Sequence, residues 1–114
     1  SELARELAEQ YTYNKSILSD VYQMFLANKK LFIQQQKNMM SRQESESILK
    51  SIQQDALIIV GKQDPFFFES TKEIAASIPN AQLEIIDECC HMVTMEKPQI
   101  TTELMRRWIE NTTN

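Results

Sequence analysis

The chain has 114 residues, 42% of them hydrophobic, and a formal net charge of −4. This length fits one small domain, and the basic residues come in short pairs such as Lys29-Lys30, not in the clusters that neutralise nucleic-acid phosphates. No apolar run approaches the roughly 18 residues of a membrane span, and no basic-then-apolar start marks a secretion signal. We therefore expect neither a nucleic-acid nor a membrane partner.

Glycine and cysteine usage narrow the class further. Gly61 is the only glycine, whereas average usage of about 7% would give roughly eight. Such a chain is expected to be helix-rich and has no glycine-rich phosphate loop. Cys89 and Cys90 are adjacent, so they are poorly placed to pair with each other, and they lack the C-x₂-C spacing of zinc sites. We expect no disulfide, no metal and a reducing, cytoplasmic compartment.

The first half of the chain is predicted to be helical. Residues 1–53 contain neither proline nor glycine, and their apolar positions recur at helical spacing. The polar stretch 34–47 predicts a bend, and Ser41 with Glu44 fits a capping box that starts a short helix. We expect about three amphipathic helices and no strand. One helix face gathers Ile17, Val21, Met24, Phe25 and Phe32.

The second half alternates between strand and helix patterns. Residues 56–60 form a short apolar run typical of a strand buried on both faces, 69–78 have helical spacing, and 83–86 predict a second strand. Pro98 opens a final helix. This order predicts a parallel β-α-β unit with a right-handed crossover. Two strands are too few for a covered parallel sheet, so the pattern is typical of the edge of a larger one.

Two polar side chains follow the predicted strands at one edge of the sheet. Asp64 lies just beyond Gly61, and His91, the only histidine, follows the second strand. Both loops leave the carboxyl edge of a parallel sheet, where neighbouring strands lie about 4.8 Å apart. We expect the carboxylate and the imidazole to lie within hydrogen-bond reach. Taken alone, Asp64 fits a turn before Pro65, and His91 fits an ordinary loop histidine. The expected proximity of the two side chains favours a functional role for both.

The same segments resemble a known family. Residues 57–65 resemble the strand that delivers the triad acid in α/β-hydrolases, an apolar run closing in G-x-x-D. Residues 78–86 are similar to the next family strand, and residues 91–98 fit H-x-x-x-x-E-x-P, whose histidine is the triad base. The resemblance implies an α/β fold class, the C-terminal part of an α/β-hydrolase. Residues 1–53 would then be a helical cap-like region and residues 54–114 a core segment.

The resemblance also implies a chemistry. Asp64 and His91 would be the acid and base of a nucleophile-His-Asp triad that hydrolyses a small ester or related acyl substrate without a metal or organic cofactor. The cap would contribute to the substrate pocket, with Met24, Phe25 and Phe32 as candidates, although ordinary helix packing is the competing interpretation. A G-x-S-x-G elbow cannot occur in a chain with one glycine, so the nucleophile, serine or aspartate, is absent. We expect the chain alone to be inactive.

Several alternatives stay open at this point. A cysteine next to the histidine would have to double back to reach its ring, which disfavours it as the nucleophile. Asp87 and Glu88 offer another acid but are typical of a solvated turn, and Glu96 is expected to cap or anchor the last helix. The alternative function is a non-catalytic protein-interaction module built on a hydrolase remnant. An unpaired strand edge also predicts that the chain self-associates.

Overall fold

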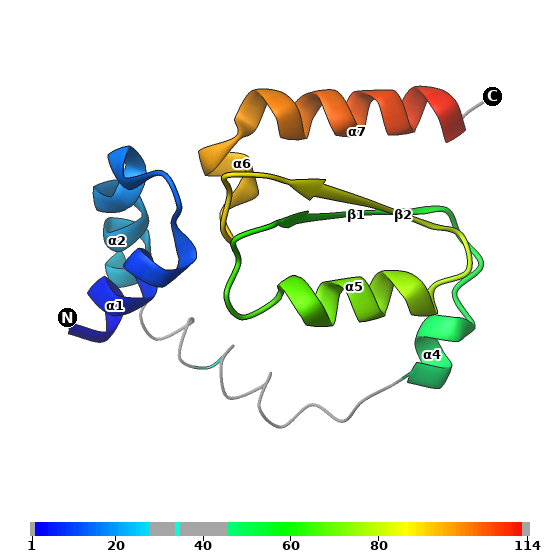
Figure 1. Cartoon of the computed structure of the whole chain (residues 1–114), viewed down its shortest axis with the longest axis horizontal. Helices are drawn as coiled ribbons and strands as arrows, with labels where there is room; N and C mark the ends of the chain where they lie inside the picture. The colour runs from blue at the N-terminus through cyan, green and yellow to red at the C-terminus, as the bar shows by residue number, and fades with distance from the viewer. Residues whose placement is uncertain (1, 28–33, 35–45, 113–114) are drawn as a thin grey trace.

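The sheet is a parallel pair covered by a helix on each face. The computed structural model describes residues 2–27, 34 and 46–112. Strand β1 (Ala56–Gly61) pairs with strand β2 (Ala81–Ile86), with Ala56 opposite Ala81 and Gly61 opposite Ile86. Helix α5 (Phe68–Ser77) lies against one face and helix α7 (Pro98–Thr112) against the other (Figure 1). The predicted parallel β-α-β unit is confirmed.

The strand and helix ends follow from local chemistry. Strand β2 begins two residues earlier than expected because the Ala56 N–H donates to the Asn80 carbonyl (3.1 Å) and so extends the ladder to the start of β1. Helix α5 ends before Pro79, which disfavours helical backbone at the residue before it. At the carboxyl ends of the strands, Val60 and Ile86 are each 4% exposed. The best-packed end of the sheet is therefore the end that carries Asp64 and His91.

The N-terminal region consists of short helices. Helices α1 (Glu2–Tyr11) and α2 (Leu18–Ala27) are joined by the 3₁₀ helix η1 (Lys15–Ile17), and α4 (Glu46–Lys50) precedes β1. The helical backbone is interrupted between α1 and η1. Asn14 caps the start of η1, because its side chain accepts from the Ser16 N–H at 3.0 Å, and the helical spacing did not predict this cap. The proposed capping box at Ser41 and Glu44, and Phe32, lie outside the described residues.

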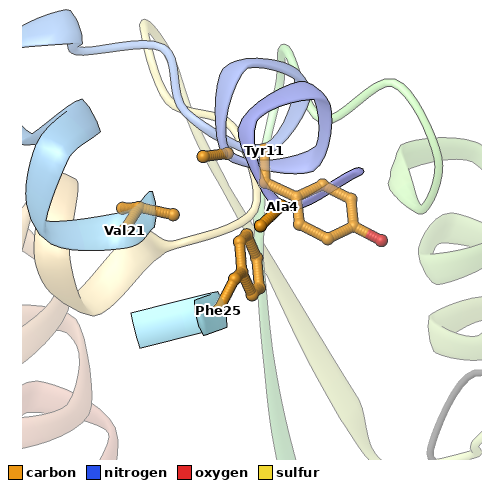
Figure 2. Packing of buried hydrophobic residues seen from close by; sticks show 5 residues of the cluster. Ala4, Tyr11, Val21 and Phe25 are labelled. Carbon is orange, nitrogen blue, oxygen red and sulfur yellow. The ribbon is translucent and has the colours of Figure 1, made fainter. Parts of the chain in front are cut away.

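The N-terminal helices share one apolar core that reaches the sheet loops. The core consists of Ala4, Ala8, Tyr11, Val21 and Phe25 (Figure 2). Partly buried side chains of the C-terminal half pack against it: Phe67, Met92 and Met95. Figure 1 shows α1 and α2 beside the carboxyl ends of the strands, near the short helix α6 (Val93–Glu96). The helical region therefore covers the end of the sheet where the two loops emerge.

One surface of the fold is hollowed beside the sheet. An open, mostly apolar groove of about 460 Å³ runs between β1 and α7, and its lining is Asp55, Ala56, Leu57, Ile59, Met105, Trp108 and Ile109. Among the described residues, no helix combines the length and the apolar character needed to cross a bilayer.

Gly61, the last residue of β1, lies close to the backbone of Cys89 and Cys90. A Cβ atom there would collide with the carbonyl oxygens of Cys89 and Cys90 and lie 2.7 Å from the Cys89 carbonyl carbon. We expect Gly61→Ala to lower the free energy of unfolding by about 1–3 kcal/mol or more, because the clash is with backbone. Urea unfolding measures this, with Ala76→Ser on the exposed face of α5 as a control that costs about 0.5 kcal/mol. Equal losses in the two variants would contradict the packing argument.

Candidate active site

The Asp64 carboxylate caps the local turn and also contacts His91. Its N–H donates to the Gly61 carbonyl (3.1 Å), and its side chain is buried, with the residue 4% exposed. Oδ1 accepts from the N–H groups of Phe66 (3.0 Å) and Phe67 (3.1 Å). Oδ2 lies 2.9 Å from Nδ1 of His91. The turn-capping role and the pairing considered for Asp64 are therefore both present in the structure.

Three contacts hold His91. Its backbone N–H donates to the Tyr11 carbonyl (3.0 Å), and its Nδ1 faces Asp64. Its ring contacts those of Tyr11, at 4.8 Å between centroids, and Phe67, at 4.9 Å. A carboxylate at Nδ1 favours the tautomer with a proton on Nδ1, which leaves Nε2 as the proton acceptor. The side chain stays 40% exposed, so the imidazole is oriented but accessible.

Aromatic side chains form a wall beside the imidazole. Phe66 meets Tyr11 edge to face, with centroids 5.3 Å apart, and lies 6.4 Å from Phe67. Phe66 is 49% exposed, whereas Tyr11 is buried. The surface next to His91 is thus apolar and partly open. Among the earlier candidates for a substrate pocket, Phe25 lies in the helical core and Met24 packs against that core.

Glu96 connects the loop of residues 87–91, here called the histidine loop, to the N-terminal region. The residue is only 6% exposed, and its Oε1 accepts from the Tyr13 N–H at 2.7 Å. Its Oε2 accepts from the N–H groups of Asn14 (3.3 Å) and Cys90 (3.4 Å). We had expected a cap or anchor for the last helix; the carboxylate instead joins residues 13–14 to the loop. Its N-terminal partners are more than 80 positions away, beyond any local pattern.

The two cysteines are packing residues of this loop. Both are free and buried, and burial raises the pKa of Cys89 to about 12 and also raises the pKa of Cys90. Since the thiolate is the reactive form, neither is suited to act as a nucleophile. The left-handed residue of the loop is Glu88, with φ 52°. The loop therefore turns without needing glycine before His91.

Asp87 was the other candidate acid. Its Oδ1 accepts from Gln63 Nε2 and from the Glu88 N–H, both at 2.9 Å. The Gln63 hydrogen bond, followed by that of Glu88, holds the pKa of Asp87 below its ordinary value. Asp87 is thus engaged with Gln63, and Asp64 is the carboxylate that contacts His91.

Comparison with known proteins assigns the chain to a class. The alpha/beta hydrolase fold family matches residues 3–98. The chain therefore belongs to the α/β-hydrolase family, and the two-stranded sheet is part of that fold.

The proteins that this chain is similar to are longer than the chain itself. Monoacylglycerol lipase ABHD6 of Mus musculus is 38% identical over 69 residues, 60% of this chain and 20% of that protein. Monoacylglycerol lipase abhd6-A of Xenopus laevis is 35% identical over 75 residues, 65% of this chain and 22% of that protein. A thermophilic esterase from Thermogutta terrifontis superposes with a TM-score of 0.84 at 22% identity, covering 97% of this chain and 44% of that one. The chain thus spans about a fifth of the curated relatives.

Proposed function

We propose that this chain supplies the acid and the base of an esterase-like hydrolase. The observation that carries the proposal is the 2.9 Å contact between Asp64 Oδ2 and His91 Nδ1, made by a buried carboxylate and an accessible imidazole. The division into a cap-like region, residues 1–53, and a core segment, residues 54–114, belongs to the same proposal. It is supported by the packing of the N-terminal helical core against Phe67, Met92 and Met95.

The proposed reaction is acyl transfer to water. A nucleophile in a part of the protein beyond these 114 residues attacks the ester carbonyl, and His91 Nε2 takes its proton. Asp64 accepts from Nδ1 and stabilises the imidazolium. His91 then returns the proton to the leaving alcohol, and the same base activates water to release the acid. An imidazole suits both transfers because its pKa lies near neutral pH.

The aromatic wall favours an apolar acyl group. Phe66 is half exposed and contacts Tyr11 and Phe67, the two rings beside His91, so it offers apolar area to an acyl chain; burying such area contributes about 25 cal/mol per Å². The relatives named as monoacylglycerol lipases and the structural neighbour named as an esterase support the same substrate class. We therefore propose a small carboxylic ester with an apolar acyl group as the substrate.

The test is a comparison of two proteins on one chromogenic acyl ester. This chain alone should show no turnover above background, because it has no nucleophile elbow. The longer protein that carries this chain together with a G-x-S-x-G segment should turn the ester over, and His91→Ala should abolish that activity. A coding sequence without such a segment, or activity that survives His91→Ala, would contradict the proposal and favour the non-catalytic interaction module.

A further inference from the structure

Gln63 lies between the two loops that carry the candidate acid and base. It directly precedes Asp64, and its hydrogen bonds run to the loop before His91. On the backbone, its N–H donates to the Cys89 carbonyl (2.9 Å), and its carbonyl accepts from the Cys90 thiol (3.3 Å). On the side chain, Oε1 accepts from the Cys89 N–H and Nε2 donates to Asp87 Oδ1, each at 2.9 Å.

The side chain of Gln63 matches this loop in both polarity and shape. A primary amide presents an acceptor oxygen and a donor nitrogen in one plane, and here they meet an N–H group and a carboxylate. The contact to Asp87 is charge-assisted, which makes it stronger than a neutral bond. Asp87 is itself held by the Glu88 N–H (2.9 Å). The amide therefore fixes the loop at the point where its backbone turns toward His91.

The distance between acid and base depends on the relative position of these two loops. The contact between Asp64 and His91 joins side chains from segments 27 positions apart, and β1 and β2 end just before it. Beyond the ladder bond from the Lys62 N–H to the Ile86 carbonyl (2.8 Å), Gln63 makes the next cross-loop contacts. A shift of about 1 Å in such a pair can cost about 100-fold in rate.

We propose that Gln63 is a positioning residue, whose side chain clamps the loop of residues 87–90 to the Asp64 turn and so sets the Asp64–His91 hydrogen bond. Its catalytic consequence rests on the proposed function, whereas its effect on the pair does not. Glu96 also binds this loop, through the Cys90 N–H, and connects it to Tyr13 and Asn14.

An exchange of donor and acceptor tests this role. Gln63→Glu keeps the length of the side chain and an acceptor for the Cys89 N–H, but it places a second carboxylate against Asp87. Asp87→Asn in the same chain supplies a donor again, so the double variant restores the bond between positions 63 and 87 with reversed polarity, while the N–H of the exposed Glu88 bonds water instead. Gln82→Glu is the matched control, because Gln82 Nε2 bonds Glu84 Oε1 at 2.8 Å on an exposed part of β2.

The readout is the proton NMR signal of His91, which is unambiguous because the chain has one histidine. In the unmodified chain, the Nδ1 proton bonded to Asp64 should resonate far downfield. Gln63→Glu should lose that signal while circular dichroism still reports a folded chain; the double variant should recover it, and Gln82→Glu should keep it. If Gln63→Glu does not fold, Asp87→Ala, which removes the acceptor of Gln63 Nε2, should weaken the signal.

Each outcome decides a separate claim. A signal that persists in Gln63→Glu, or that the double variant does not recover, overturns the role of Gln63. A downfield signal in a longer protein that has no turnover overturns the proposed function and leaves Gln63 as the clamp of the pair. Absence of the signal from the unmodified chain overturns both. In an active longer protein, Gln63→Glu should lower kcat by about 100-fold with little change in KM.

Discussion

Asp64→Asn should lower kcat about 10⁴-fold in the longer hydrolase that carries this chain, the size of effect seen for the same change in serine-protease triads. The carboxylate 2.9 Å from Nδ1 selects the tautomer that leaves Nε2 free to accept a proton. An amide in its place can donate to Nδ1, which favours the opposite tautomer. KM should change little, because Asp64 is buried beneath the accessible imidazole. Steady-state ester hydrolysis measures both constants.

The choice of asparagine separates catalysis from folding. Its Oδ1 can still accept from the N–H groups of Phe66 and Phe67, which Asp64 now caps at 3.0 and 3.1 Å. The fold should therefore persist, as circular dichroism can verify. Asp55→Asn, at an exposed position just before β1, is the matched control and should leave kcat unchanged. A folded Asp64→Asn enzyme within about tenfold of the parent would refute the assigned role, since triad logic requires far more.

Glu96→Ala should lower the free energy of unfolding by about 2–4 kcal/mol, because a buried N–H group left without an acceptor costs about 1–3 kcal/mol, and the bond from Cys90 is buried while those from Tyr13 and Asn14 are partly buried. The carboxylate accepts from the backbone N–H groups of Tyr13, Asn14 and Cys90. Its removal would also take away one of the links between the N-terminal helices and the loop that carries His91, where the Tyr11 contacts would remain. Urea unfolding followed by tryptophan fluorescence measures the change, because Trp108 is the only tryptophan.

Two further variants calibrate that result. Glu96→Gln has a single acceptor oxygen in place of two, so its free energy of unfolding should lie between those of the parent and Glu96→Ala. Glu73→Ala, at an exposed position of α5, should stay within about 0.5 kcal/mol of the parent. A loss below about 1 kcal/mol in Glu96→Ala would show that water replaces the carboxylate at these N–H groups.

The β-α-β unit and the placement of the acid beside the base were predictable from local patterns. The apolar run before Gly61 and the proline after helix α5 mark element ends that depend on neighbouring residues only. Parallel strands then bring their carboxyl-end loops to one edge. Asp64 and His91 are consequently 2.9 Å apart, although 27 positions separate them in the chain.

The contacts that surround this pair were not predictable in the same way. The stacking of Tyr11 on His91 and the bonds from Tyr13 and Asn14 to Glu96 join segments about 80 positions apart. No periodicity encodes such pairs, because they depend on how the N-terminal helices pack on the loops. Glu96 at the end of α6 resembles a helix-terminus residue in sequence, and only its burial reveals the other role.

The side chains around His91 also determine the direction in which a proton can travel. Tyr11 and Phe67 both lie against the imidazole, with their own centroids 6.3 Å apart, while Asp64 occupies the Nδ1 edge. Proton exchange with substrate is therefore confined to the Nε2 edge, in the plane of the ring. When the imidazole becomes charged, the rings of Tyr11 and Phe67 attract the cation, which contributes about 0.5–2 kcal/mol. This attraction takes the place of part of the hydration that solvent would otherwise supply.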